Sequence, residues 1–462
     1  MGINVKEDGN WRSFRHRNYR ILFPANTVSN IGSWAQRVAQ DWLVLELTHS
    51  GTYLGIVTAI QFTPVLFFSL HGGALADRFD KRKLLIGTNA LGAFSAMALG
   101  TLVMTDQIAL WHVFALADRF NKRKLLIGTN ALGAFSAMAL GILVMTDHIA
   151  LWHVFALAAV LGISTAVDAP VRQAFAAEIV GHDDLPNAVS LNSANFNAGR
   201  LVGPALSGLL IAAFGTGPSF LVNGVSYLFA IGALMAMNEK EFFHQDRPKS
   251  MTNVREGLRY ALARPDIYVV MLMVFFLGTF GLNFQIFNAL MATKEFGKGP
   301  ASYGLLGTFV AIGSFSGAIA SARLERFRKT RFVILAGGAF AGAIMVLSIM
   351  PSYTAYAIFL PICGVTALTT MITANSIVQV NSDPAIRGRV MGIYLLIFMG
   401  GTPVGSPVIG IMAEVIGIRL TIAGCGAICL ISTLVIWLKY KDRVDVPADI
   451  SVASVLKSAN RD

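Results

Sequence analysis

The sequence predicts an all-α membrane protein, built from two pseudo-symmetric six-helix bundles and one duplicated helical unit. Apolar residues make up 55% of the 462-residue chain and charged residues only 14%, whereas soluble domains carry about 25% charge. The apolar residues form continuous runs close to the ~20 residues of a spanning helix, and not the short alternating segments of a membrane β-barrel. One long polar stretch, 238–265, divides these runs into two sets.

Thirteen apolar runs are long enough to be expected as membrane spans. They lie near residues 22–46, 52–75, 84–105, 125–146, 149–168, 188–213, 217–237, 267–291, 302–322, 332–350, 353–376, 390–414 and 418–439. The third and fourth spans belong to a tandem repeat, because residues 74–114 and 115–155 are one passage written twice. The two copies differ only at Asp80/Asn121, Thr101/Ile142 and Gln107/His148.

The distribution of charge predicts the topology. The net charge of +11 comes from Lys and Arg clustered in alternate connections, such as 12–20, 81–83 and 323–331, while connections such as 48–52 carry little positive charge. This is the positive-inside pattern, which places both termini in the cytoplasm. The excess charge therefore indicates a membrane partner and argues against nucleic acid. We expect a multi-pass protein of a bacterial cytoplasmic (inner) membrane.

The two sets of spans echo one another, which suggests related bundles and a binding site between them. Gly73-Ala-Leu-Ala-Asp77-Arg78 has a degenerate counterpart at Gly317-Ala-Ile-Ala-Ser321-Ala-Arg323. The expected domains are an N-terminal cytoplasmic segment (1–20), an N-terminal bundle that includes the repeat (21–237), a cytoplasmic linker (238–266), a C-terminal bundle (267–440) and a cytoplasmic tail (441–462).

Two motifs and three further passages resemble a known transporter family. Gly73-x-Leu75-Ala-Asp77-Arg78-x-x-Lys81-Arg82 resembles the loop motif between the second and third helices of the major facilitator superfamily. The run at 199–208 is similar to its fifth-helix antiporter motif, with Ser207 at a usual glycine. The passages at 33–42, 170–173 with 185–193, and 387–392 resemble the bacterial branch of enterobactin exporters and macrolide-efflux-like drug:proton antiporters. The resemblance implies a major facilitator fold.

The resemblance implies a role for each motif. Gly73, Asp77, Arg78, Lys81 and Arg82 are expected to form a conformational latch of the outward-facing state. The alternative is that the basic residues only fix orientation against anionic headgroups. The antiporter-like residues are expected either to seal against leak or simply to pack closely, as small residues do in lipid. These four residues are Gly199, Gly203, Pro204 and Gly208.

Charges inside predicted spans are functional candidates because they are costly there. Arg200 lies near mid-membrane, with no acid nearby on its own helix. Arg37 with Asp41, and Asp168 with Arg172, have i,i+4 spacing, so either pair could be a local ion pair. Our hypothesis is that Asp41 titrates during transport, that Arg37 and Arg200 compete for it, and that Arg200 also attracts anionic substrate groups.

Uncharged polar residues in the spans are expected either to line the cavity or to hold helices together. They are Asn26, Asn30, Gln36, Gln61, Asn192, Asn197, Asn283 and Gln285.

For the repeat, we expect one copy to fill the third-helix position and the other to be displaced, since an extra crossing would invert the second bundle. Gly73 directly precedes the first copy, which slightly favours that copy as the third helix. The second copy instead leads directly into the next span at 158–161, which favours the second copy.

The sequence therefore predicts a secondary active transporter that exports small amphipathic molecules by alternating access, with a proton as coupling ion. A siderophore or lysophospholipid exporter of the same fold is the alternative. The eight histidines are scattered and the three cysteines lie in apolar spans, so neither an enzyme, a metal site nor a cofactor is expected. A monomer is expected, and a non-transporting sensor is disfavoured.

Overall fold

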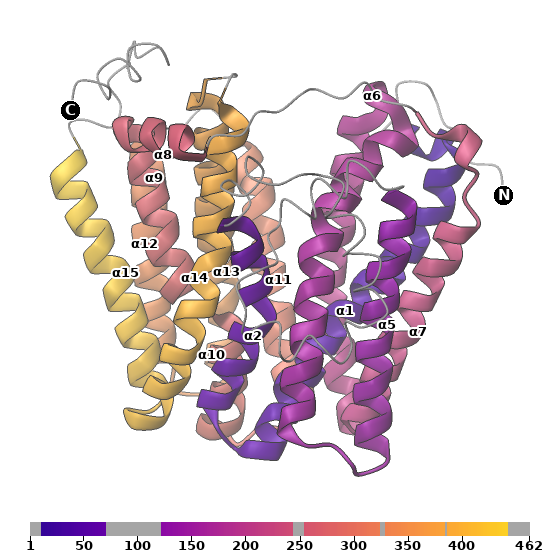
Figure 1. The fold of residues 1–462 in the computed structure, drawn as a ribbon. Coiled ribbons are helices and arrows are strands. Elements are labelled where there is room, and N and C mark those ends of the chain that lie inside the picture. Colours follow the sequence, from indigo (N-terminus) through magenta and orange to yellow (C-terminus); the bar gives the residue numbers. More distant parts are fainter. Residues whose placement is uncertain (1–10, 71–121, 244–253, 324–328, 384–385, 442–462) are drawn as a thin grey trace.

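The protein consists of long helices arranged in two groups (Figure 1). Its structure is a computed structural model that describes residues 11–70, 122–243, 254–323, 329–383 and 386–441. The N-terminal half contains η1 (Arg12–Arg15), α1 (Arg17–Thr48), α2 (Gly51–Leu70), α5 (Lys122–Met145), α6 (Leu151–Phe214) and α7 (Thr216–Met235). A short 3₁₀ turn, η3 (Glu239–Glu241), and the surface helix α8 (Val254–Ala263) follow. The C-terminal half contains α9 (Pro265–Phe276), η4 (Leu277–Gly281), α10 (Phe284–Leu290), η5 (Met291–Glu295), α11 (Pro300–Arg323), α12 (Thr330–Ser348), α13 (Tyr353–Asn381), α14 (Arg387–Val415) and α15 (Ile418–Tyr440).

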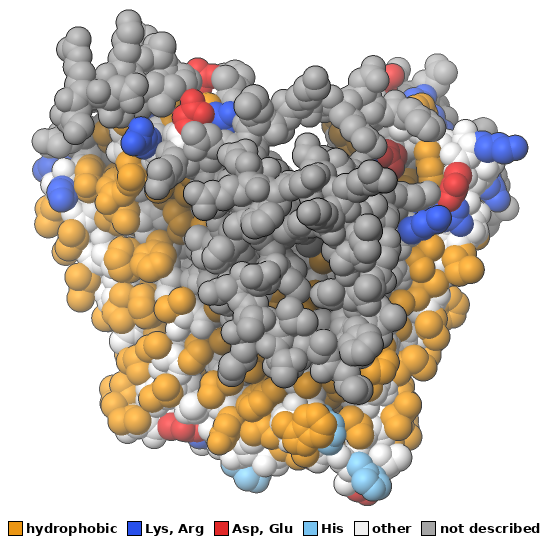
Figure 2. Space-filling model, in the orientation of Figure 1, with side chains coloured by type: hydrophobic (Ala, Val, Ile, Leu, Met, Phe, Trp, Pro, Cys, Tyr) orange, Lys and Arg blue, Asp and Glu red, His pale blue; other side chains and the backbone are white. Residues whose placement is uncertain are grey.

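The described residues contain many helices that are long and apolar enough to cross a membrane. Nine helical stretches in them are long and apolar enough to span a bilayer, one of which, Pro265–Glu295, runs from α9 through η5. The stretch α6 has 64 residues and folds at Gly181, where φ is 71°, so it crosses twice. The helices α1 and α2 lie with these stretches in the N-terminal half, and the chain is an all-α membrane protein. Hydrophobic side chains cover the flanks of the molecule, and Lys and Arg gather along its upper rim (Figure 2).

In both halves, the last two helices are joined by a tight turn that contains a glycine with positive φ. Gly215 joins α6 to α7 with φ 78°, and Gly417 joins α14 to α15 with φ 83°. Glycine adopts positive φ at little steric cost, which permits these tight reversals between long helices. We call this lower end of the molecule in Figure 1 the hairpin end. It also holds the short connections 49–50, 146–150 and 349–352.

The second copy of the repeat supplies the helix that packs in the N-terminal group. Its helix α5 contacts α6 and α7. At its start, Arg123 donates hydrogen bonds to the carbonyls of Leu234 (2.6 Å) and Met235 (2.7 Å), which end α7. Lys122 also pairs with Glu178 of α6. The slight preference for the first copy was therefore wrong, because the direct connection into α6 and these contacts hold the second copy. The first copy, 74–114, lies outside the described residues.

Candidate functional site

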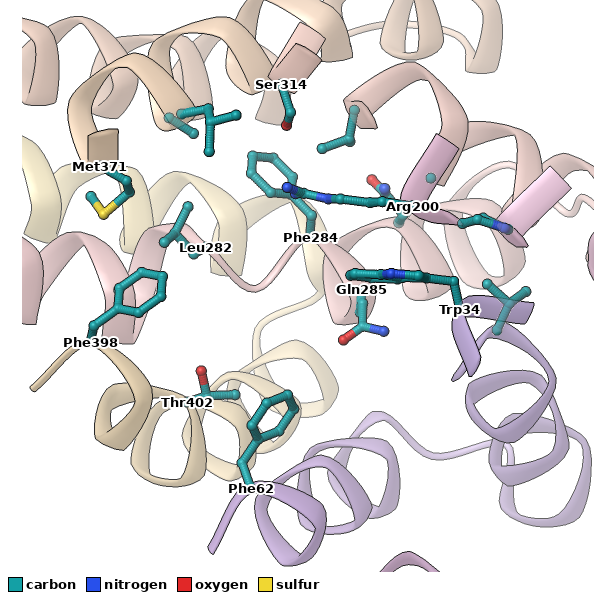
Figure 3. Close-up of a pocket in the computed structure, with 18 of the residues that line it drawn as sticks. Trp34, Phe62, Arg200, Leu282, Phe284, Gln285, Ser314, Met371, Phe398 and Thr402 are labelled. Carbon is teal, nitrogen blue, oxygen red and sulfur yellow. The ribbon is translucent and has the colours of Figure 1, made fainter. Parts of the chain in front are cut away.

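A cavity of about 280 Å³ lies between the two helix groups and is lined by residues of both (Figure 3). α1, α2 and α6 contribute Trp34, Phe62 and Arg200 to its wall. The rest of the wall comes from the C-terminal half, including Leu282, Gln285, Ser314, Met371, Phe398 and Thr402. The cavity is therefore shared by both halves, as alternating access about a central site requires.

The cationic part of the cavity is built around the indole ring of Trp34. The Arg37 guanidinium lies 4.7 Å from the centre of this ring and the Arg200 guanidinium lies 5.9 Å from it. Arg37 also lies 5.8 Å from the centre of the Phe62 ring. Cation–π contacts of this kind partly offset the cost of keeping a guanidinium away from water. The structure thus brings together two of the charges singled out in the sequence.

Asp41 makes a contact between the two halves instead of an ion pair with Arg37. The Tyr303 hydroxyl of α11 donates a hydrogen bond of 2.7 Å to Asp41 Oδ2 of α1. Both residues are buried, with 5% of Asp41 and 3% of Tyr303 exposed. Tyr303 also lines the cavity. Its role was missed in the sequence because nothing in a helical pattern tells which tyrosine faces the other bundle.

The antiporter-like run at 199–208 packs α6 against two partners. A Cβ on Gly203 would lie 2.5 Å from Cβ of Trp34 on α1, while one on Gly208 would lie 2.8 Å from the Pro300 carbonyl at the start of α11. A Cβ on Gly304 of α11 would in turn lie 2.2 Å from the Pro204 carbonyl. Gly199 packs closely against Asn30 of α1. The missing side chains let the two halves touch backbone to backbone between the cavity and the hairpin end.

A second contact between the halves joins α2 and α14 at the hairpin end. Gly55 packs on the backbone of Ser406, and Gly410 on that of Gly51. Glu414 of α14 accepts hydrogen bonds from the Thr52 hydroxyl (2.6 Å), the Thr52 backbone N–H (3.3 Å) and the Ser50 hydroxyl. Its carboxylate therefore caps the first turn of α2, where the helix dipole favours negative charge. We call these contacts the Glu414 clasp.

Asp168 and Arg172 lie apart from the cavity and form a local ion pair. The Arg172 guanidinium donates to both carboxylate oxygens of Asp168, at 2.7 and 2.8 Å, and to Asn26 of α1 at 2.5 Å. Thr129 of α5 donates to the same carboxylate at 3.0 Å. This geometry ties α6 to α1 and α5, which favours the interpretation of a structural pair over that of a coupling site.

Most of the polar residues proposed to line the cavity hold helices together. Gln285 lines it, whereas Gln36 accepts from Asn223, Gln61 from Gln40 and Asn192 from Tyr19. Asn30 donates to the carbonyl of Asn195 on α6, and Asn283 accepts from the Ser406 hydroxyl of α14. Asn197 instead donates to the carbonyl of Ser193, one turn earlier in its own helix. The residues proposed as the latch, Gly73, Asp77, Arg78, Lys81 and Arg82, lie outside the described residues.

Two groups of membrane-spanning helices around one shared cavity define a transporter of the major facilitator type. The sequence pattern of the transmembrane secretion effector family matches residues 8–117 and 113–454. The chain belongs to this family of major facilitator transporters. The two matches meet at the junction between the copies of the repeat, so each copy falls in a different match.

Relatives across the whole length are bacterial transporters. The chain is 21% identical to the staphyloferrin A transporter of Staphylococcus aureus, over 89% of this chain and 94% of that protein. It is 23% identical to the multidrug efflux pump Tap of Mycolicibacterium fortuitum (87% and 90%) and 20% identical to the enterobactin exporter EntS of Escherichia coli (86% and 85%). The family and these relatives are transporters and not enzymes.

Solved structures share the fold at low identity. An inward-facing, unoccupied bacterial homolog of the human lysosomal transporter Spinster matches with a TM-score of 0.65 at 14% identity, over 93% of this chain and 98% of that one. A D-xylose–proton symporter matches with a TM-score of 0.64 at 12% identity, over 90% and 97%. The prediction of a major facilitator fold is therefore confirmed.

Proposed function

We propose that this transporter exports small amphipathic molecules in exchange for protons, and that Asp41 is the group that takes up and releases the proton. The observation that supports this most is the hydrogen bond between Asp41 and Tyr303, since it joins a buried carboxylate on one half to the other half. Efflux is supported by the relatives whose names describe an efflux pump and an exporter.

Protonation of Asp41 would change how firmly the two halves hold each other. A hydrogen bond to a carboxylate is roughly twice as strong as one between neutral groups. The charged form of Asp41 therefore stabilises the arrangement in which Tyr303 approaches it, and the protonated form stabilises it less. A carboxylate that couples its protonation to the contact between bundles can link a proton gradient to alternating access.

The arrangement described here is closed at the hairpin end. Three contacts contribute to this closure: the Glu414 clasp, the packing of Gly208 and Gly304 against the opposite half, and the bond between Asp41 and Tyr303. With both termini in the cytoplasm, as the basic connections indicate, the hairpin end faces outward. We therefore propose that this arrangement is an inward-facing state in which Asp41 is charged.

An efflux assay in cells that lack their own drug pumps tests this function. Cells are loaded with a fluorescent amphipathic dye, and its loss is followed with and without a protonophore. We expect efflux that the protonophore abolishes and that Asp41→Asn reduces at equal abundance in the membrane. The matched control is Glu46→Gln, since Glu46 is an exposed carboxylate on the same helix. Undiminished, protonophore-sensitive efflux by Asp41→Asn would remove Asp41 from the mechanism.

A further inference from the structure

Two positive side chains share one aromatic ring beside the cavity. Arg37 and Arg200 come from different helices, α1 and α6, and both guanidinium groups lie over Trp34. Trp34 and Arg200 both line the cavity. Two like charges gathered at one ring within a membrane protein make a positive local potential, which the single negative charge of Asp41 beside Arg37 offsets only in part.

Within the part of the chain that the structure describes, neither guanidinium has an ion pair or a hydrogen bond. Two other half-buried arginines do have such a partner: Arg172 binds Asp168 and Arg264 binds Asp266. Asp41 lies one turn from Arg37, but its Oδ2 is occupied by the Tyr303 hydroxyl. A guanidinium removed from water normally needs an anion or several acceptors. The place for that anion beside Arg200 is in the cavity.

The rest of the cavity is suited to an apolar body. Figure 3 shows Trp34, Arg200 and Gln285 together on one side, and Leu282, Met371 and Phe398 on the other. Gln285 adds a polar amide next to the cationic side. The cavity volume of about 280 Å³ is at the lower end of the sizes that hold small organic ligands.

The geometry points to an amphipathic organic anion as the substrate class. Its carboxylate, sulfonate or phenolate is held by Arg200, Arg37 adds positive potential from its place over the same Trp34 ring, and its apolar body lies against Leu282, Met371 and Phe398. This inference rests on the proposed export function and specifies the substrate of the same site. Arg200 then discriminates by charge, whereas Asp41 couples transport to protons.

Binding to the purified full-length chain in detergent tests the inference. The probes are dansylglycine, a carboxylate, and dansylglycinamide, its neutral amide, both followed by dansyl fluorescence. We expect the carboxylate to bind at least tenfold more tightly than the amide. Arg200→Gln should remove this preference without weakening amide binding, and Arg200→Lys should keep part of it. Melting temperature and elution volume confirm that each variant is folded.

Arg419→Gln is the matched control. Arg419 also lies over an aromatic ring, 5.6 Å from the centre of Phe296, but it is paired with Glu295 at 2.5 Å. We expect this substitution to leave the carboxylate preference unchanged. Absent carboxylate binding, equal binding of the two probes, or unaltered carboxylate binding by Arg200→Gln would each overturn the inference.

A separate transport experiment tells whether the anion site or the proton-coupled export is wrong. Proteoliposomes of the unsubstituted chain are tested for dye transport driven by a pH gradient. If transport depends on the gradient and on Asp41 but Arg200 confers no preference for the carboxylate, proton-coupled export stands and the anion site is wrong. If Arg200 confers the preference but no gradient drives transport, the anion site stands and the coupling is wrong.

Discussion

The hydroxyl of Tyr303 and the carboxylate of Asp41 lie 2.7 Å apart although they belong to different halves of the protein. Tyr303→Phe removes only the hydroxyl, so it keeps the ring that packs beside the cavity. A hydrogen bond to a charged group contributes about 1.5–3 kcal/mol. We expect the population that is open at the hairpin end to rise about tenfold or more, measured as the distance between spin labels at Leu47 and Leu305. Both positions are exposed and lie on α1 and α11.

Tyr353→Phe is the control for this substitution. The Tyr353 hydroxyl donates to the Ser302 carbonyl at 2.9 Å, a contact within the C-terminal half. Its loss should leave the label distances unchanged. Equal distances in the Tyr303→Phe and unsubstituted chains would show that the bond between Tyr303 and Asp41 does not hold the halves together.

The Glu414 clasp gives a second prediction about closure. Glu414→Gln removes the negative charge from the first turn of α2, which is worth about 0.3–1 kcal/mol near a helix N-terminus. We expect a shift towards the open hairpin end of up to roughly fivefold, smaller than that of Tyr303→Phe. The same spin-label distances measure it, and Glu46→Gln again serves as a control. A shift larger than that of Tyr303→Phe would make the clasp the main closing contact.

Close packing at Gly304 gives a steric prediction. Any Cβ there would lie 2.2 Å from the Pro204 carbonyl and 3.0 Å from Cα of Gly208, and backbone atoms cannot move aside easily. We therefore expect Gly304→Ala to prevent full closure and to reduce transport severely at normal abundance. At Gly299, a Cβ would meet nothing within 4 Å, so Gly299→Ala is the matched control. Normal transport by Gly304→Ala would contradict the closed contact between α6 and α11.

The ion pair of Asp168 and Arg172 should act on stability more than on coupling. Asp168→Asn leaves Arg172 without its carboxylate, while the two side chains are 22% and 30% exposed. Solvent screening at such exposure reduces the expected cost to about 1–2 kcal/mol. We expect a lower melting temperature in detergent with the dependence of efflux on the proton gradient retained. Asp183 is exposed, so Asp183→Asn should change neither the melting temperature nor the proton dependence of efflux. If Asp168→Asn instead loses the proton dependence at unaltered stability, the ion pair takes part in coupling.

Deletion of either repeat copy should leave a working transporter. Because the copies differ at three positions, removal of 74–114 or of 115–155 yields almost the same chain. Both products place Gly73 directly before Ala-Leu-Ala-Asp-Arg and retain one third helix. We expect both to export dye at least as well as the full chain. Loss of transport in both deletions would mean that the duplicated unit has a function of its own.

Much of the fold followed from the sequence because spanning helices reveal themselves as apolar runs. The expected spans 149–168 and 188–213 correspond to the two parts of α6, and the unusual glycine content of 199–208 correctly indicated close packing. The repeat was harder. Its copies have nearly identical propensities, so only the contacts of Arg123 and Lys122 show which copy packs in the N-terminal group.

The site could be predicted only in part. Arg37, Asp41 and Arg200 stand out because charges are rare in apolar spans. Tyr303 and Glu414 do not stand out, since their importance comes from partners more than 200 residues away in the chain. Helical periodicity identifies a buried face but does not tell which face meets the other half. For the same reason, polar residues such as Gln36 and Asn30 were not distinguishable from cavity-lining ones.

Transport by proteoliposomes containing Asp41→Asn tests the central claim most directly. Two modes are compared, net uptake driven by a pH gradient and exchange of labelled for unlabelled substrate at equal pH. Exchange needs alternating access but no net proton movement. The proposed role of Asp41 predicts that Asp41→Asn loses gradient-driven uptake and keeps exchange. Gradient-driven uptake that survives Asp41→Asn would contradict it.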